Sequence, residues 1–262
     1  MEVLLYILAG ATVGLAVGLT GVGGGSLMTP LLLLFGFPPH IAIGTDLMYA
    51  SVTKASGVSL HHKRRTINWR LVGLLGAGSL PAAGLTVLIL NAYFKDSSEY
   101  SHLLTSSLGF MLIMTAAVLL ARSRLAVINS QSSITTTIRQ FIQRHLTGIT
   151  LIMGALLGTL VTLSSVGAGA IGTALLMVLY PQLTGVKIVG TDLAHAVPLT
   201  FIAGIGHVWL GNVDFGLLVS LLVGSIPAIY IGSRLGAHLP EKVMHPVLAS
   251  TLLALGVKYA FF

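Results

Sequence analysis

The chain contains no cysteine and very little charge. Only 8% of its 262 residues are Asp, Glu, Lys or Arg, whereas soluble domains average about 25%. Without cysteine there is no disulfide scaffold, no zinc–thiolate site and no thiol nucleophile. The shortage of charge and the lack of a sustained heptad pattern also exclude a disordered protein, a coiled coil and a nucleic-acid binder.

Apolar residues make up 55% of the chain. Such a chain lacks the polar surface to cover a globule in water, so we expect a multi-pass integral membrane protein with the lipid bilayer as its partner. A spanning helix needs about 20 apolar residues. The apolar stretches are 3–20, 26–37, 41–60, 68–90, 102–121, 147–163, 169–181, 187–206, 213–233 and 246–262.

Two of these stretches, 26–37 and 169–181, are too short to cross the bilayer as straight helices. About 12 residues give roughly 18 Å, against a hydrocarbon core of about 30 Å. Each stretch follows a glycine-rich break. Backbone at membrane depth must be buried in protein or line a wet cavity, so we predict broken or re-entrant hairpins over 3–37 and 147–181.

Basic residues gather in two polar gaps and orient the chain. They are Lys63, Arg64, Arg65 and Arg70 in one gap, and Arg122, Arg124, Arg139 and Arg144 in the other. Cytoplasmic loops carry an excess of Lys and Arg, so we expect both gaps inside the cell and 91–101 outside. We therefore divide the chain into a first transmembrane repeat (1–121), a cytoplasmic linker (122–146) and a second transmembrane repeat (147–262).

An internal similarity relates the two repeats. The segment 17–25 aligns with 161–169, 43–47 with 189–193, and 78–82 with 224–228. In the same register His61 meets His207. Several matches in one register indicate a duplication.

Charge predicts that the two repeats have opposite orientations in the membrane. Segment 61–70 holds four basic residues, whereas its counterpart 207–214 holds none and ends in Asp214. The predicted fold is an all-α integral membrane protein of two inverted repeats, each a broken or re-entrant hairpin plus three transmembrane helices. Many secondary transporters share this organisation. Two parallel repeats of four spans each are the alternative.

The glycine-rich breaks at 20–26 and 164–170 are candidate anion sites. Glycine permits positive φ and close approach, so several backbone N–H groups and a helix N-terminus can converge on one ligand. Glycines also serve plain helix packing, which we expect for Gly10, Gly14 and Gly18. That packing lies either within one chain or between two chains of a homodimer.

Asp46 and Asp192 occupy equivalent positions inside apolar segments. A charge near the bilayer centre costs about 2.5–3.5 kcal/mol or more, which makes such residues functional candidates. We expect them to accept a proton or cation during transport. The alternatives are a wet position near a membrane face and a helix-capping role.

Polar neighbours complete the candidate site. His195 shares a helix face with Asp192, as Tyr49 does with Asp46. Lys54 could pair with an anion, although a lysine there more often snorkels, and His61 and His207 at helix ends better suit a solvated or gating role. The expected substrate contacts are Thr20, Gly23, Gly24, Gly25, Ser26, Thr45, Tyr49, Ser164, Ser165, Gly167, Gly169, Thr191 and His195.

Enzyme chemistry finds little support. The serines of the breaks have no defined base partner, there is no Gly-x-Ser-x-Gly elbow, and the nine histidines are scattered. We therefore expect no catalytic residues, no cofactor and no resident metal. An anion channel is a further alternative, since a glycine-rich break can form a filter.

Several motifs carry a family resemblance. A glycine run ending at Gly25 is followed by Pro30 and by Gly44-Thr45, and the stretches 61–69, 207–215 and 224–227 supply His, Asn-Trp, Gly-Asn-Val-Asp-Phe and Gly-Ser-Ile-Pro. Together they resemble the TauE/SafE family of membrane permeases, the sulfite exporter group, over nearly the whole chain. The resemblance implies a carrier in the bacterial inner membrane that exports sulfite, sulfoacetate or another organosulfonate.

Two departures from the family pattern matter. Asp46 and Asp192 follow the Gly-Thr pairs, where family members often have a small residue, and the second glycine run is reduced. An acid in each half would repel an anion unless it is protonated, so we add proton coupling to the prediction. The alternative is a proton- or cation-coupled carrier of a small carboxylate or metal ion.

Overall fold

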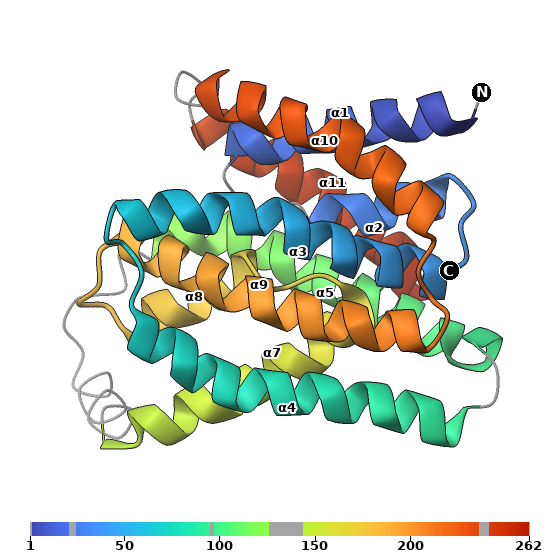
Figure 1. The fold of residues 1–262 in the computed structure, drawn as a ribbon. Helices are drawn as coiled ribbons and strands as arrows, with labels where there is room; N and C mark the ends of the chain where they lie inside the picture. The colour runs from blue at the N-terminus through green and yellow to red at the C-terminus, as the bar shows by residue number, and fades with distance from the viewer. Residues whose placement is uncertain (1, 21–24, 95–96, 126–143, 236–240, 262) are drawn as a thin grey trace.

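The computed structural model describes residues 2–20, 25–94, 97–125, 144–235 and 241–261, and the regular structure within these ranges is entirely α-helical (Figure 1). The first half contains α1 (Glu2–Thr20), α2 (Gly25–Leu34), α3 (Pro39–Lys63), α4 (Trp69–Tyr93) and α5 (Ser97–Leu125). The second contains α7 (Leu146–Ser164), α8 (Ala170–Leu179), α9 (Gly185–Trp209), α10 (Phe215–Leu235) and α11 (Glu241–Phe261).

These helices confirm an all-α membrane protein. Six of the described helices are long and apolar enough to span a membrane. The short arms are also confirmed, because α2 and α8 have 10 residues each, about 15 Å at 1.5 Å per residue. The largest difference in length is at α5, which runs beyond the expected 102–121 at both ends. The remainder of the expected linker, 126–143, lies outside the described residues.

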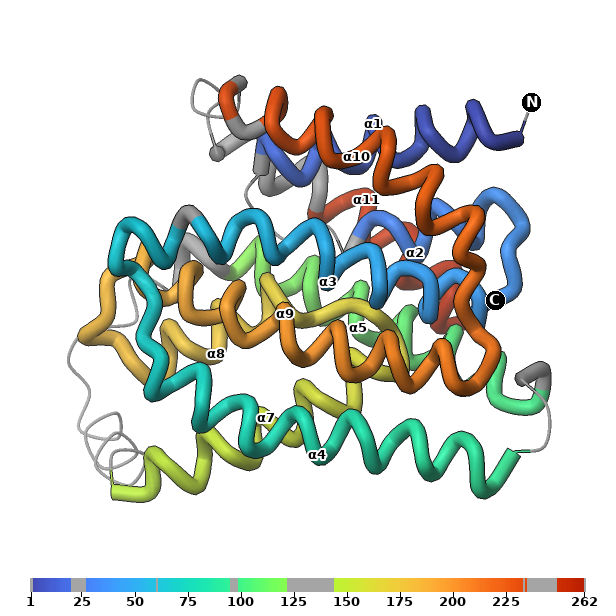
Figure 2. The backbone as a smooth tube through the Cα atoms, in the orientation of Figure 1, coloured from blue at the N-terminus to red at the C-terminus, as the bar shows by residue number. Residues whose placement is uncertain are grey.

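The described helices pack in four main pairs, and each pair joins the two halves. Helix α1 packs on α10, α7 on α4, and α5 on α11, while α3 and α9 pack on each other. Figure 2 shows α3 and α9 side by side in the middle, with the α1–α10 pair on one flank and the α4–α7 pair on the other. The two halves therefore interlock rather than forming separate bodies.

Equivalent helices of the two halves run in opposite directions in Figure 1. Helices α1 and α3 run from right to left, whereas their counterparts α7 and α9 run from left to right. Likewise α4 runs from left to right and α10 from right to left. Each half thus begins at the end of the bundle opposite to the other half.

Glycines bring the paired helices to backbone contact. A Cβ at Gly10 or Gly14 would overlap the backbone of Leu221 or Ser225 on α10, and one at Gly232 would meet the backbone of Gly18. The small-residue face of α1 therefore packs within the chain, which answers the question that the sequence left open for these glycines. The same arrangement recurs in the α7–α4 pair, where Gly154 and Gly158 contact Leu75 and Ser79.

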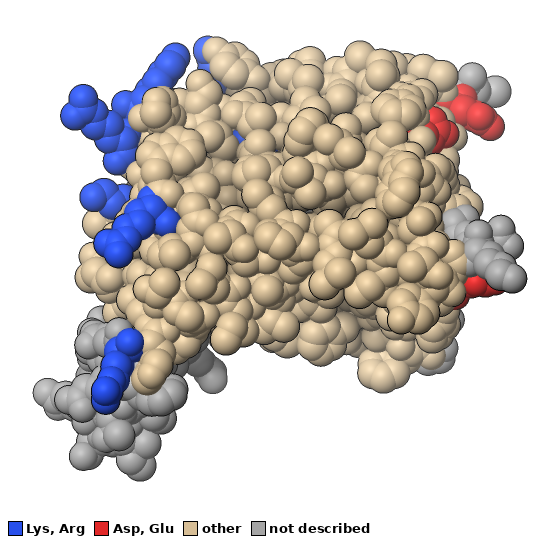
Figure 3. Space-filling model, turned by 60° about the horizontal axis from the view of Figure 1, so that its bottom comes forward, with Lys and Arg blue, Asp and Glu red and all other residues tan. Residues whose placement is uncertain are grey.

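The charges separate to the two ends of the bundle. Figure 3 shows Lys and Arg at one end of the visible face and Asp and Glu at the other. The basic end carries the 61–70 gap between α3 and α4 and the start of α7 with exposed Arg144. Exposed Glu2, Glu99 and Asp214 lie where α1, α5 and α10 begin. This polarity is typical of a protein oriented in a membrane.

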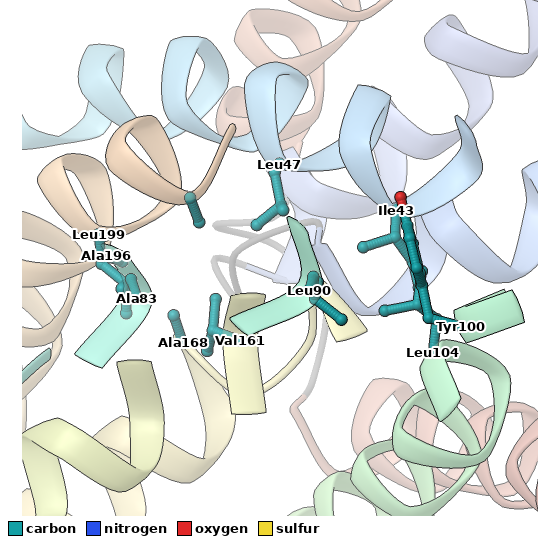
Figure 4. Close-up of a cluster of buried hydrophobic side chains, with 11 residues drawn as sticks. Ile43, Leu47, Ala83, Leu90, Tyr100, Leu104, Val161, Ala168, Ala196 and Leu199 are labelled. Atoms are coloured by element: carbon teal, nitrogen blue, oxygen red, sulfur yellow. The ribbon is translucent and has the colours of Figure 1, made fainter. Parts of the chain in front are cut away.

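A buried apolar cluster joins the halves around the second break (Figure 4). It contains Ile43 and Leu47 of α3, Val161 of α7, and Ala168 of the segment between α7 and α8. The remaining members are Ala83, Leu90, Tyr100, Leu104, Ala196, Leu199 and Ala203. The break is therefore fixed by side chains from both halves.

Candidate functional site

The second glycine-rich break is a buried, tightly folded segment. Ser165 has φ 59°, and Gly167 and Gly169 have φ 115° and 136°, so the chain turns through the left-handed region three times. The Ser164 hydroxyl donates to the Leu160 carbonyl (2.6 Å) and accepts from the Val166 N–H (3.2 Å). Residues 164–168 are all buried. Irregular backbone at this depth is thus enclosed by protein, as expected for a broken membrane helix.

The first break is described only in part. Helix α1 ends at Thr20, and α2 begins with Gly25 and Ser26. Gly23 and Gly24 lie outside the described residues, as do the side chains of Thr20 and Ser26. Their expected contacts with substrate stay predictions.

Asp46 and Asp192 lie in the interiors of α3 and α9 and are 0% and 2% exposed. Their burial rules out a wet position at a membrane face. Neither residue is at a helix N-terminus, so neither caps its own helix. Both of the structural alternatives raised by the sequence are therefore excluded.

The two carboxylates are held in equivalent ways by the short arms. Asp46 Oδ2 accepts from the Thr29 hydroxyl (2.5 Å) and the Thr29 N–H (3.2 Å) on α2. Asp192 Oδ2 accepts from the Thr173 hydroxyl (3.1 Å) on α8. The Oδ1 atoms of both residues are buried and have no hydrogen-bond partner among the described residues. Each half thus presents one unpartnered carboxylate oxygen.

Lys54 on α3 is buried rather than snorkelling, because only 4% of it is exposed. Its Nζ donates to the Ala168 carbonyl of the second break (3.0 Å). It also interacts electrostatically with Asp192 and, less strongly, with Asp46. The two carboxylates and the ammonium therefore form one buried charged cluster across both halves.

Tyr49 and His195 each bind a serine on a proline-containing helix of the other half. The Tyr49 hydroxyl pairs with Ser225 Oγ on α10 (2.6 Å), and His195 Nε2 pairs with Ser79 Oγ on α4 (2.8 Å). His195 Nδ1 has no hydrogen bond and is buried. The Ser165 hydroxyl interacts with Asp46 but forms no hydrogen bond of ordinary geometry. Both atoms add to the unpartnered polar groups of the cluster.

Thr45 and Thr191 contact the loops of the opposite half. Thr45 Oγ1 accepts from the Asp214 N–H (3.1 Å), and Thr191 Oγ1 accepts from the Asn68 N–H (3.0 Å). Asn68 and Asp214 in turn accept from N–H groups in the first turns of α4 and α10. These contacts give both threonines a role in joining the halves.

The two helix-end histidines differ in burial. His207 is fully buried, receives a hydrogen bond on Nδ1 from Asn212 (3.2 Å) and donates from Nε2 to the Thr162 carbonyl (3.0 Å). His61 is only partly buried and pairs with Thr66 Oγ1 (2.8 Å). The expectation of a solvated position is therefore wrong for His207, because the start of α5 covers it through Tyr100, which bonds Asn212.

Metal-binding geometry does not arise in the described part of the chain. Among those residues there is no group of three or more His, Asp or Glu side chains arranged to hold a metal ion. The cluster is instead a set of proton-accepting and charged groups, which suits the handling of protons and small ions.

Comparison with known protein families identifies the family of this chain. Residues 6–259 match the model of the family described as Sulfite exporter TauE/SafE. This chain belongs to the TauE/SafE family. The resemblance stated from the motifs is therefore confirmed over almost the whole chain.

Curated relatives carry transporter names. The TauE/SafE chain is 37% identical to the probable membrane transporter protein YjnA of Bacillus subtilis, covering 96% of this chain and 97% of that protein. It is 28% identical to YdhB of the same organism (98% and 100% covered) and 28% identical to a probable membrane transporter protein of Methanocaldococcus jannaschii (97% and 93%). No solved structure matches the chain. With six membrane-length helices in the part of the chain that the structure describes, this TauE/SafE protein is a multi-pass membrane transporter.

Sequence reasoning missed several partners in this TauE/SafE site. Thr29 and Thr173 were not considered, and neither were Ser79 and Ser225, although both serines stand in the aligned Gly-Ser-x-Pro motifs. The internal repeat was the available signal, because each pair occupies equivalent positions. The sequence favours snorkelling for Lys54, because its position in the helix suggests that the side chain reaches the membrane surface.

Proposed function

We propose that this protein is a secondary carrier that exports a small sulfur oxyanion, such as sulfite, sulfoacetate or another organosulfonate, with proton coupling. One observation carries the proposal: equivalent carboxylates of the two halves are buried with unpartnered oxygens, and the buried Lys54 ammonium interacts with both and donates to the second break. The family description supplies the sulfur oxyanion as substrate class. Asp46 and Asp192 are the two candidates for the proton acceptor.

The halves are proposed to be inverted repeats that rock about this cluster. The opposite directions of α3 and α9 in Figure 1 support inversion. The basic gap between α3 and α4 would face the cytoplasm. Because each flanking pair contains one helix from each half, movement of one pair changes the relation of both halves to the centre, as alternating access requires.

Substrate contacts are proposed around the second break first. Ser165, Gly167 and Gly169 belong to the break whose Ala168 carbonyl binds Lys54, and the Ser165 hydroxyl has no hydrogen bond among the described residues. Tyr49, Thr45, Thr191 and Ser164 already hold hydrogen bonds within the protein. Substrate would have to displace those bonds, so we place these four residues in the surrounding shell.

A second candidate function keeps the architecture and changes the cargo. With both aspartates ionised, the cluster of Asp46, Asp192 and Lys54 has a formal charge of −1, and buried excess charge is costly. A carrier of a cation, or of a small carboxylate together with protons or a cation, would relieve this excess. The channel alternative has no comparable support.

Flux measurements on purified protein test the proposal. The protein is placed in liposomes, and uptake of radiolabelled sulfite and small sulfonates is measured with and without a pH gradient. We expect saturable flux that the pH gradient accelerates, and competition among sulfur oxyanions. Steady current without coupling would indicate a channel.

The same liposomes decide between the two carriers. Radiolabelled acetate and rubidium serve as the carboxylate and cation probes. Saturable uptake of either probe, with no flux of any sulfur oxyanion, would refute the sulfur oxyanion assignment while keeping a carrier. Liposomes without protein give the background, which matters because protonated weak acids cross bilayers unaided.

A further inference from the structure

Lys54 is the one Lys or Arg that is buried among the described residues. Its hydrogen bond to the Ala168 carbonyl uses one of the three N–H donors of an ammonium. The equivalent position in the second half is Thr200, whose hydroxyl donates to Ala196 of its own helix (2.9 Å). The duplicated site therefore has one cation, and both halves share it.

Asp192 depends on this cation more than Asp46 does. Asp46 accepts two hydrogen bonds from Thr29, one of them from backbone. Asp192 accepts one, from the Thr173 hydroxyl, and its other oxygen lies against the Cα of Gly172 without a donor. Of the two carboxylates, Lys54 interacts more strongly with Asp192. Without the positive charge of Lys54, Asp192 would be a buried carboxylate stabilised by a single neutral hydrogen-bond donor, the Thr173 hydroxyl.

We infer that Lys54 binds the anionic group of the substrate, and that Asp192 takes up one proton when the bound substrate neutralises the charge of Lys54. This inference rests on the proposed function and adds the binding residue and the coupling step. An oxyanion bound to Lys54 cancels the positive charge that otherwise offsets the Asp192 carboxylate. A carboxylate that loses its buried counter-charge is stabilised by becoming a neutral acid.

The charge balance fixes the stoichiometry. For a monoanion, the substrate brings one negative charge and the proton, taken from water on the same side of the membrane, brings one positive charge. The bond formed is O–H on Asp192, and release of the substrate returns the proton to the solution on the other side. Asp46 keeps its state throughout, so one proton accompanies each monoanion and the cycle moves no net charge.

The other titratable groups around this pair have separate partners. His195 interacts with Lys54 but is held through Nε2 by Ser79. A charged His195 would be repelled by the Lys54 ammonium, so it is a poor place for the extra proton. His61 approaches Gly190 from the end of α3 and is bonded to Thr66. Of the two carboxylates that interact with Lys54, Asp192 has fewer other hydrogen bonds than Asp46.

Methanesulfonate is the probe that isolates the protein's proton. A sulfonate stays a monoanion across the neutral range, so any accompanying proton must ride on the protein. Radiolabelled methanesulfonate flux and internal pH are followed in proteoliposomes whose membrane potential is clamped. The wild-type protein should carry one proton per sulfonate and be insensitive to potential.

Two variants separate the two parts of the inference. Asp192→Asn should still bind methanesulfonate but carry no proton, so that its flux becomes driven by membrane potential. Lys54→Gln should raise KM at least tenfold, whereas Lys187→Gln, which removes an exposed lysine of α9, should match the wild type. Because Lys54→Gln leaves both aspartates without a cation, Lys54→Gln/Asp192→Asn is the balanced variant, and it should fold and keep the raised KM.

Each failure has its own pattern. One proton per sulfonate in Asp192→Asn would overturn the assignment of the coupling step. A wild-type KM in the balanced double variant would overturn the role of Lys54. If the wild-type protein carries neither methanesulfonate nor sulfite, the proposed function falls, and this inference falls with it.

Discussion

The two halves of the molecule use the same hydrogen-bonding framework with different chemical groups. The framework pairs Thr29 with Asp46 and Thr173 with Asp192. The groups differ where Tyr49 is replaced by His195 and where Lys54 is replaced by Thr200. Duplication thus accounts for the scaffold, while a few unequal positions give the centre its cation and its imidazole.

The two ends of the bundle differ as well. At the end where α9 finishes, His207, Asn212 and Tyr100 form a buried network that closes on the Thr162 carbonyl. At the other end the equivalent His61 and Thr66 are only partly buried. An alternating carrier needs one end to be more tightly packed than the other at any time, and the structure has the His207 end packed.

The largest effect is expected where the flanking pairs touch through glycine. A Cβ at Gly78 would overlap the Leu151 carbonyl, and one at the equivalent Gly224 would overlap the Ile7 carbonyl. Gly78→Ala and Gly224→Ala should each lower the free energy of unfolding by about 3 kcal/mol, because backbone cannot yield as a side chain can. Thermal unfolding in detergent measures both.

Gly73→Ala is the matched control on α4, because no atom lies within 4 Å of a Cβ at that position. It should be neutral or slightly stabilising, since alanine favours helix. A loss in only one of Gly78→Ala and Gly224→Ala would show that the two flanking contacts are not equivalent.

The next largest effect tests the difference between the two ends. His207→Ala leaves the Thr162 carbonyl and Asn212 buried without their partner, at a cost of about 2 kcal/mol. His61→Ala removes a partly exposed pair and should cost about 1 kcal/mol or less. Equal losses of unfolding temperature would contradict the assignment of the packed end.

A smaller difference is expected between the hydroxyl donors of the two carboxylates. Thr173→Val removes the hydrogen bond that Asp192 accepts, whereas Thr29→Val leaves Asp46 the backbone N–H of residue 29. Thr173→Val should therefore cost about 1 kcal/mol more than Thr29→Val. Denaturant or thermal unfolding measures the stability of both variants. A larger loss of stability for Thr29→Val would mean that Asp46, and not Asp192, depends more on its threonine hydroxyl.

Most of the fold could be predicted from the sequence because apolar length and charge position are linear properties. The short arms, the ten apolar segments and the burial of Asp46 and Asp192 needed no knowledge of which helices meet. The position of the Lys54 side chain could not be predicted without that knowledge. Its partner Ala168 is distant in sequence and contacts Lys54 only because α3 packs on the other half. The same holds for the packing of Gly10 on α10.

The candidate site was predicted more unevenly than the fold. The internal repeat identified Asp46 and Asp192 as equivalent residues, and it identified Ser165 as part of the second glycine-rich break. The repeat did not show that the hydroxyls of Thr45 and Thr191 accept hydrogen bonds from the opposite half. Both threonines stand beside an aspartate in the sequence, where they look equally able to bind substrate. Whether a hydroxyl is used within the protein or is free to bind substrate depends on which residues lie near it in the folded structure.

The smallest perturbation decides whether the halves are inverted in the membrane. Arg70 and Gly216 occupy equivalent, exposed positions in the first turns of α4 and α10. A Cβ at Gly216 meets only Asp214 Oδ1, at 3.4 Å, so Arg70→Cys and Gly216→Cys should leave stability and flux unchanged. The chain has no cysteine of its own, and a membrane-impermeant maleimide therefore reports these sites without background.

Inverted halves require Gly216→Cys to react in intact cells and Arg70→Cys to react only after permeabilisation. Three basic residues, Lys63, Arg64 and Arg65, remain to hold the orientation when Arg70 is replaced. Labelling of both positions from one side would establish parallel repeats, and the basic end would then have to be explained without inversion.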